Sequence, residues 1–365
     1  MKELESKAES VSASASELRK IIDLRHPPVF LSSQSLNAPP ITTRLGLAQR
    51  LQGHEGRIFS LSWAGPGSSA NPAALYTLAS VSVTGEVSIW NTRKGTAVAK
   101  GVIAGEDSWL MTCAFEKQSS SLLGVGGRTG KCWLFTVACR HAEVTMEVQP
   151  RVSFQPHPNY LSALDFPGPA ELLTASGDCT CRLWSVNSTS APVTEFKSHT
   201  EDVISLSVCP LNPALFLSGS CDRTVKLWDM RSGGKARRSF DWHSADVNSV
   251  CFFPNSIYTY ASACSDGCMF VWDIRAIRPI GLYNWSHSPI SALAVSMSGR
   301  LIISANEDGE IAVSDTLNGA ETVQRLGEHQ AKVTELEVSP DGATIASCGF
   351  DREVLLFQTL KLHPS

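Results

Sequence analysis

Histidine, serine and aspartate, the residue types of many hydrolytic and metal sites, recur along this 365-residue chain. In one stretch, His199 is followed by Ser218 and then, four residues later, by Asp222. Such a set can activate a serine nucleophile, and histidine with a carboxylate can bind zinc. The histidines, however, each fall in a separate repeat, at His54, His157, His199, His243, His287 and His329. We therefore predict a structural role for them, and no catalytic residue, metal or cofactor.

A second marker shows that this repeat covers most of the chain. Alternating runs end at Trp90, Phe135, Trp184, Trp228, Trp272, Ser314 and Phe357, at intervals of 45, 49, 44, 44, 42 and 43 residues. Within one unit, residues 202–208, 214–220 and 224–229 alternate like β-strands, and residues 237–242 form a fourth run. Four short strands with Trp-Asp closing the third are typical of WD40 repeats. Seven units predict an all-β, seven-bladed WD40 β-propeller.

The recurring polar residues are predicted to satisfy one another inside each blade. In propellers that resemble this one, a histidine bridges a hydroxyl and a carboxylate, and the hydroxyl also accepts a bond from the Trp indole. Leaving such buried groups unpaired would cost about 1–3 kcal/mol each. We predict two sets of four, called tetrads below: His199, Ser218, Asp222 and Trp228, and His243, Ser262, Asp266 and Trp272.

Other units keep this tetrad pattern to different degrees. The third unit has a full set in His157, Thr174, Asp178 and Trp184. The sixth and seventh lack the tryptophan but keep His287, Ser304 and Asp308, and His329, Ser347 and Asp351. The first has Thr84 where the aspartate is expected, and the second is off pattern, with Glu106 or Asp107 near the place of the histidine.

The two ends of the repeat region are predicted to meet. The last unit ends soon after Phe357 and lacks a fourth strand, whereas residues 45–52 precede the first histidine without belonging to another unit. We expect residues 45–52 to supply the missing strand, which would close the ring and remove an open sheet edge. The propeller would then comprise residues 44–365.

Residues 1–26 follow a different, helical period. Apolar residues are spaced by 4, 3, 4, 3 and 4 at Leu4, Ala8, Val11, Ala15, Leu18 and Ile22. This spacing predicts a coiled-coil helix that needs a partner helix; the alternative is a mostly disordered tail. Pro27 and Pro28 end the pattern, and residues 27–43 are predicted to form an extended connector.

Composition narrows the function classes. The formal net charge is −4, so no overall positive field favours nucleic acid. The sequence contains no 18-residue apolar run and no apolar signal segment near its N-terminus. The 11 cysteines include no CxxC pair, and we interpret them as reduced, mostly buried residues.

Several blade-specific strings resemble the β subunit of heterotrimeric G proteins, in the same order. They include "DSWLMTCAF" (107–115), "GVGGRTGKC" (124–132), "SGSCDRTVKLWD" (218–229) and "HSADVNSVCFFPN" (243–255). The resemblance implies a non-catalytic signal transducer that pairs permanently with a γ subunit through the helix stripe. It also implies binding of the GDP-bound α subunit and, after release, of effectors. Localisation would be the cytoplasm and the cytoplasmic face of the plasma membrane, through lipidated partners.

The resemblance also implies which residues contact the α subunit and effectors. They are Arg57, Phe59, Trp109, Met111, Arg128, Tyr160, Asp202, Ile204, Asp246, Asn248 and Phe350. Most precede or begin the first strand of a unit, and such loops gather at one end of a propeller. Aromatic residues ringed by charge have the composition of binding hot spots. Departures from the family pattern are Arg128 for Leu, Gly130 for Asn, Ile204 for Met, Ser265 for Asp and Phe350 for Trp.

Two other function classes compete with this one. Another WD40 scaffold or adaptor could organise a multiprotein complex, because the fold hosts many roles; the N-terminal heptads and the Trp109 string favour the G protein subunit. An enzyme is disfavoured because "GVGGRTGK" (124–131), the one phosphate-loop-like string, lies in a predicted β-turn region with no helix after it.

Overall fold

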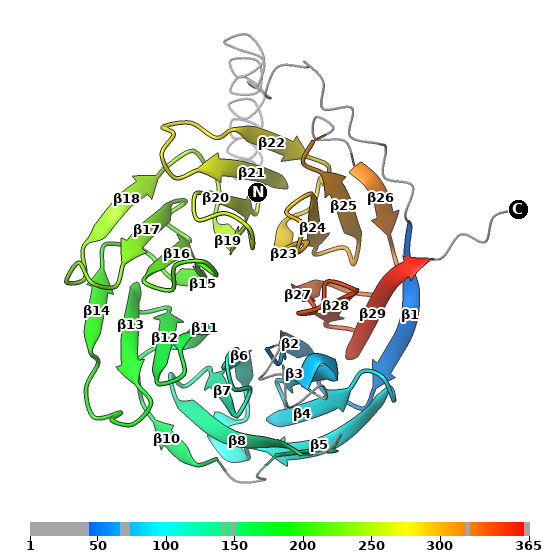
Figure 1. The fold of residues 1–365 in the computed structure, drawn as a ribbon. Coiled ribbons are helices and arrows are strands. Elements are labelled where there is room, and N and C mark those ends of the chain that lie inside the picture. The colour runs from blue at the N-terminus through cyan, green and yellow to red at the C-terminus, as the bar shows by residue number, and fades with distance from the viewer. Residues whose placement is uncertain (1–43, 66–73, 141–142, 147–149, 318–321, 361–365) are drawn as a thin grey trace, which may run out of the picture.

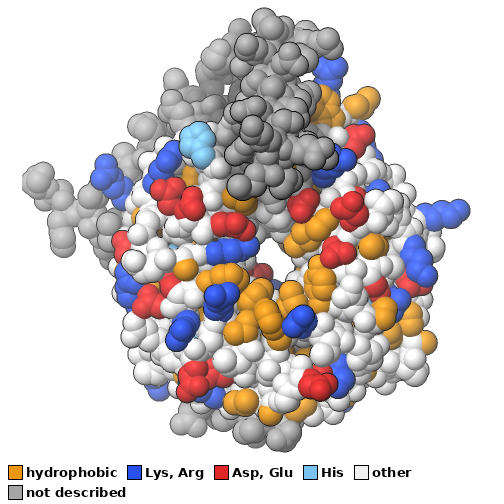
Figure 2. Space-filling view, turned by 180° about the vertical axis from the view of Figure 1, so that it is seen from behind, with side chains coloured by type: hydrophobic (Ala, Val, Ile, Leu, Met, Phe, Trp, Pro, Cys, Tyr) orange, Lys and Arg blue, Asp and Glu red, His pale blue; other side chains and the backbone are white. Residues whose placement is uncertain are grey.

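Seven antiparallel sheets are arranged radially in a ring (Figure 1). A channel runs through the centre of this ring, and its opening is visible in the space-filling view (Figure 2). The computed structural model describes residues 44–65, 74–140, 143–146, 150–317 and 322–360. Within this part of the chain the predicted seven-bladed, all-β propeller is confirmed. The predicted coiled-coil helix (1–26) and connector (27–43) lie outside the described residues.

The strands of each blade are listed here from the channel outward, with labels that follow the order of the chain. Blade 1 has β2 (Ile58–Trp63), β3 (Thr77–Ser82), β4 (Glu86–Asn91) and β5 (Thr96–Val102); blade 2 has β6 (Leu110–Phe115), β7 (Leu122–Gly127), β8 (Cys132–Arg140) and β10 (Val152–Phe154), with β9 (Glu143–Met146) also paired to β8. Blade 3 has β11 (Leu161–Gly168), β12 (Glu171–Ser176), β13 (Thr180–Ser185) and β14 (Thr194–Lys197); blade 4 has β15 (Val203–Val208), β16 (Leu215–Ser220), β17 (Val225–Asp229) and β18 (Ala236–Phe240).

The remaining blades follow the same order. Blade 5 has β19 (Val247–Phe252), β20 (Thr259–Cys264), β21 (Cys268–Asp273) and β22 (Gly281–Asn284); blade 6 has β23 (Ile290–Val295), β24 (Leu301–Asn306), β25 (Ile311–Asp315) and β26 (Thr322–Leu326). Blade 7 has β27 (Val333–Val338), β28 (Thr344–Gly349), β29 (Glu353–Leu360) and β1 (Arg44–Gln52). Two 3₁₀ turns, η1 (Ala74–Tyr76) and η2 (Gly105–Asp107), lie between strands.

The N-terminal strand closes the ring as predicted. β1 pairs antiparallel with β29 from Arg44 opposite Leu360 to Gln52 opposite Glu353. Outside the ladder, Arg50 donates to Glu353 at 2.7 Å and to Glu328 at 2.9 Å. The outer edge of blade 7 is thus covered by a segment about 300 residues away in sequence, which fixes both ends of the ring.

The core lies between neighbouring sheets. One cluster, for example, joins Leu173 and Ala175 of blade 3 to Val203, Phe216 and Trp228 of blade 4, all almost fully buried. The middle strands are covered by neighbouring sheets on both faces. All six residues of β16 are therefore buried. Burying aromatic side chains of this size is the main source of blade-to-blade stability.

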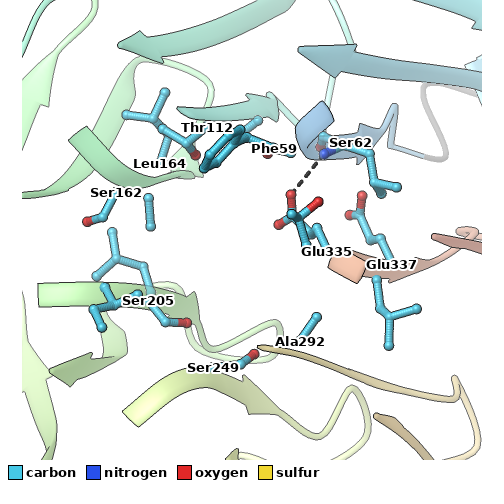
Figure 3. Close-up of a pocket in the computed structure, with 18 of the residues that line it drawn as sticks. Phe59, Ser62, Thr112, Ser162, Leu164, Ser205, Ser249, Ala292, Glu335 and Glu337 are labelled. Carbon is cyan, nitrogen blue, oxygen red and sulfur yellow. Dashed lines mark hydrogen bonds between the residues drawn. The ribbon is translucent and has the colours of Figure 1, made fainter. Parts of the chain in front are cut away.

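The innermost strands are also linked around the channel by side chains that accept backbone N–H groups. Ser205 accepts from Val250 at 3.1 Å and Ser249 from Leu293 at 3.1 Å. Between blades 7 and 1 the acceptors are carboxylates: Glu335 accepts from Leu61 at 2.8 Å and Glu337 from Trp63 at 2.6 Å. Figure 3 shows both glutamates facing the channel from the same strand. Burial raises the pKa of Glu335 to about 7.

Candidate protein-binding face

The histidine tetrads are complete in blades 3 and 4, as predicted. In blade 4, His199 Nδ1 donates to Asp222 at 2.7 Å, Ser218 donates to His199 Nε2 at 2.6 Å, and the Trp228 indole donates to Ser218 at 2.8 Å. The corresponding distances in blade 3, among His157, Asp178, Thr174 and Trp184, are 2.8, 2.7 and 3.2 Å. Every polar atom of this chain of bonds has a partner, so the set can be buried without penalty.

Blades 1 and 7 use variants of the same set. His329 contacts Asp351 and Ser347, each at 2.7 Å, with Phe357 in place of the tryptophan. In blade 1, Glu86 takes the acidic role that Thr84 cannot fill, at 3.2 Å from His54 Nδ1. The longer glutamate reaches back from two residues further along the chain, and sequence analysis missed it. The sequence feature that points to Glu86 is an acidic residue two positions after the place where the tetrad aspartate is expected.

The predicted tetrad of blade 5 is only partly formed. His243 bonds Ser262 at 2.7 Å and Trp272 bonds the same hydroxyl at 2.7 Å, but His243 Nδ1 is buried without a partner among the described residues. Asp266 is bonded instead to Ser244, to Cys264 and to the backbone N–H of Cys268.

The prediction that Asp266 pairs with His243 was therefore wrong. In blade 4 the hydroxyl of Thr224 donates to Asp222 at 2.6 Å, whereas blade 5 has Cys268 at this position. That hydroxyl is not required for the pair, because blade 7 has Glu353 there and Asp351 still contacts His329 at 2.7 Å. In blade 5, Ser244 and Cys264 bond Asp266, and the ring of Phe270 packs against His243 at 4.9 Å.

The predicted set in blade 6 does not form. His287 and Asp308 are exposed, and Ser304 Oγ is buried without a partner among the described residues. The histidine stands three residues before β23, whereas in the five other blades that carry one it stands four residues before the first strand. Ser286 therefore occupies the inward position, where Asn306 donates to it at 3.1 Å. This one-residue difference was visible in the sequence.

Blade 2 replaces the tetrad with an ion pair. Asp107 accepts from Thr129 at 2.8 Å and from Lys131 at 2.6 Å. The lysine holds the pKa of this carboxyl below its usual range. Of the two acids that sequence analysis placed near the missing histidine, Asp107 is the one that links the entering loop to the β7–β8 turn.

The histidine sets have the surroundings of scaffold residues. Burial lowers the pKa of His54, His157, His199 and His243, so these rings are neutral at pH 7. The hydroxyls that bond the histidines of blades 1, 3, 4, 5 and 7 each belong to the same blade as their histidine. Among the described residues, no group of three or more His, Cys, Asp or Glu side chains could hold a metal ion.

The eleven predicted contact residues, in contrast, gather around one end of the central channel. Four of them lie just before or at the start of the innermost strands of blades 1 and 2: Arg57, Phe59, Trp109 and Met111. Arg128 directly follows β7, the second strand of blade 2. The others are Tyr160, Asp202, Ile204, Asp246, Asn248 and Phe350, at equivalent places in blades 3, 4, 5 and 7. Figure 2 shows hydrophobic side chains beside the channel opening, with Lys and Arg side chains among them.

One half of this face is aromatic and basic. The Phe59 ring lies 6.4 Å from that of Trp109 and 5.2 Å from that of Phe350. Arg57 stacks over Phe350 at 5.0 Å and Arg128 over Trp109 at 4.8 Å. We call these five residues the aromatic–arginine patch. The Trp109 side chain is 40% exposed, unusually open for an indole next to other rings.

The other half is acidic. The Tyr160 hydroxyl donates to Asp202 at 2.5 Å, and burial together with this acid raises the pKa of Tyr160. The Tyr160 ring can lie against blade 3 because Gly177 has no side chain: a Cβ there would stand 2.3 Å from it. Asn248 is held by Ser265 at 3.1 Å and by the carbonyl of Ile290 at 2.8 Å. Asp202 and Asp246 are half-buried beside these groups.

The channel between the innermost strands has a volume of about 480 Å³ and opens between the two halves. Met111, Ile204 and Asn248 line it together with Phe59, Tyr160 and Phe350. Lys332 also lines it, stands 6.0 Å from the Phe350 ring and bonds Glu307 at 2.6 Å. Sequence analysis missed this lysine, although it occupies the same place before its strand as Arg57 does in blade 1.

Gly130 belongs to the backbone of this face and not to its contacts. It is buried with a φ of +79°, and a Cβ would stand 2.3 Å from the carbonyl oxygen of His157. A left-handed turn so close to another backbone favours glycine. This departure from the family pattern therefore has a local structural reason.

Comparisons with known proteins identify the family of the chain. Residues 8–358 match a family described as "G protein beta WD-40 repeat protein". The chain belongs to this family. It is 44% identical to the guanine nucleotide-binding protein subunit beta of Lymnaea stagnalis, over 82% of this chain and 83% of that protein. It is 40% identical over the same shares to the G(I)/G(S)/G(T) subunit beta-1 of Homarus americanus.

A third relative matches over a shorter span. The chain is 30% identical to the subunit beta-1 of Caenorhabditis briggsae over 57% of this chain and 56% of that protein. Family membership accounts for the seven WD40 blades. In the described part of this family member, no helix is long and apolar enough to cross a membrane.

Proposed function

We propose that this chain is the non-catalytic β subunit of a heterotrimeric G protein, and that the face around the channel opening is where its partners bind. The observation that supports this most is the gathering of eleven residues from six blades at one end of a ring whose family is that of G protein β subunits. Unlike the tetrad positions, equivalent positions on this face carry different residue types in different blades, such as Arg57, Trp109 and Tyr160.

The proposed ligand of this face is the GDP-bound α subunit, with effectors binding there after its release. Trp109, Phe59 and Phe350 offer exposed aromatic area, and aromatic residues are enriched at the centres of protein interfaces. Asp202 and Asp246 lie across the opening and would fix the orientation of a partner by charge. The two halves together span the width of the channel mouth.

Permanent pairing with a γ subunit is proposed through residues 1–26. The stripe from Leu4 to Ile22 supplies an apolar seam of about three heptads, which is marginal alone and needs a second helix. The family match begins at residue 8, so it includes most of this stripe. Attachment to the cytoplasmic face of the plasma membrane would come from lipidated partners.

Co-expression tests both proposals. The full-length chain should co-elute with a G protein γ subunit in size-exclusion chromatography, and the pair should bind immobilised α subunit loaded with GDP more tightly than α loaded with a GTP analogue. Leu18→Pro should abolish co-elution, because proline breaks the helix. A chain that folds but binds neither γ nor α, from a panel of both, would contradict the proposal and favour an adaptor.

A further inference from the structure

Arg128 has an unusual position on the channel face. Its guanidinium lies 4.8 Å from the centre of the Trp109 ring, and its backbone N–H donates to the carbonyl of Trp109 at 2.9 Å. The side chain is exposed, and among the described residues no carboxylate lies within 4.0 Å of it. Arg128 is therefore held in place by the indole and keeps its N–H donors for another molecule.

Arg57 repeats this arrangement on the other side of the patch. It stacks over Phe350 at 5.0 Å, is exposed, and also has no carboxylate partner in the described part of the chain. Lys332 differs, because Glu307 at 2.6 Å neutralises it. The two arginines thus stand over connected rings, since Phe59 contacts both Trp109 and Phe350.

This geometry limits what can cover the patch. An apolar partner surface would remove two guanidinium groups from water without compensation, which is costly. A stacked guanidinium keeps its donors in the ring plane, and these suit the two oxygens of a carboxylate. A partner that buries the rings must therefore bring an acid to the edge of the patch.

We infer that the aromatic–arginine patch binds an acidic side chain flanked by apolar residues on a protein partner, and that Arg128 is the residue that selects for the acid. This inference rests on the proposed function, because it takes the face to be a site for proteins. An anionic lipid surface fits less well: Asp202 and Asp246 lie at the same end of the ring, just before β15 and β19, and the formal net charge of the chain is −4.

The test is a selection from a displayed library of random peptides on the immobilised full-length chain, which requires neither an α nor a γ subunit. The wild type should enrich peptides with Asp or Glu next to large apolar residues. Arg128→Leu should lose the acidic preference while still selecting apolar peptides. Arg93→Leu is the matched control. Arg93 also stacks over an aromatic ring, that of Tyr76 at 4.1 Å. It lies between β4 and β5, at the other end of the blade from this face. The control variant should select like the wild type.

A selected peptide then gives the size of the effect. Changing its acid to the amide should weaken binding to the wild type about tenfold, near 1.4 kcal/mol, and weaken binding to Arg128→Leu less than twofold. Equal acidic enrichment on wild type and Arg128→Leu would overturn the inference, as would tighter binding to phosphatidylserine vesicles than to any selected peptide. Failure to bind α or γ while acidic peptides are selected would count against the proposed function alone.

Discussion

The tetrads and the channel face use the same residue types in opposite surroundings. Trp228 is fully buried and Trp109 is 40% exposed; Asp222 is bonded to a histidine inside its blade, whereas Asp202 stands at the channel mouth. The tetrad members recur at a fixed position in several blades, whereas the position just before the innermost strand carries Arg57 in blade 1, Trp109 in blade 2 and Tyr160 in blade 3. In a repeat protein, recurrence marks what every unit needs to fold, and function is carried by residues that differ between equivalent positions.

The largest effect should follow from breaking a complete tetrad. Asp222→Ala would leave His199 Nδ1 and the backbone N–H of Thr200 without their acceptor, so the free energy of unfolding should fall by about 3 kcal/mol. Asp308→Ala, at the equivalent but exposed position in blade 6, should change it by less than about 0.5 kcal/mol. Urea denaturation measures both. Similar losses for the two variants would mean that blade 6 does contain a buried set.

The incomplete tetrad of blade 5 should make stability depend on pH. Burial lowers the pKa of His243 to about 4, below its unfolded value near 6.5. As the pH falls from 7 to 5, the unfolded chain takes up a proton that the folded chain does not, so the wild type should lose about 2 kcal/mol more than His243→Gln. Unfolding curves at the two pH values measure this difference. Equal losses would show that His243 is not buried as the neutral ring.

Two buried serines give a smaller, matched comparison. Ser218 joins His199 and Trp228, and Ser218→Ala should cost about 1–2 kcal/mol because both partners lose a bond. Ser304 stands at the same position in blade 6 but has no partner among the described residues. Ser304→Ala should therefore be neutral or slightly stabilising. Thermal unfolding monitored by circular dichroism can compare the pair, and a larger loss for Ser304→Ala would refute the account of blade 6.

Much of the fold followed from periodicity alone. The interval between closing aromatic residues set the number of blades, and the unpaired run at 45–52 predicted the strand that pairs with β29. These predictions succeeded because they depend on the alternation of many residues, which single substitutions do not alter.

The polar sets were harder to predict because each depends on one or two atoms. In blade 5, Ser244 and Cys264 bond Asp266 in place of the histidine, and in blade 6 a one-residue shift exposes His287. Glu86 restores the set of blade 1 from an unexpected position. The face residues lie at one end of the ring because they hold equivalent places in their blades, but the pairing of Arg128 with Trp109 and of Arg57 with Phe350 depends on side-chain packing that spacing does not encode.

The affinity of the GDP-bound α subunit for the Trp109→Ala chain, paired with γ, tests the central claim most directly. Because Trp109 is exposed and lies outside the tetrads, the variant should keep the melting temperature of the wild type within about 2 °C and bind α at least tenfold more weakly. Tyr258→Ala, which removes an aromatic side chain of the same exposure (40%) from the turn between β19 and β20, at the other end of the blade, should bind like the wild type. Unchanged affinity for Trp109→Ala, with the fold intact, would contradict the assignment of this face.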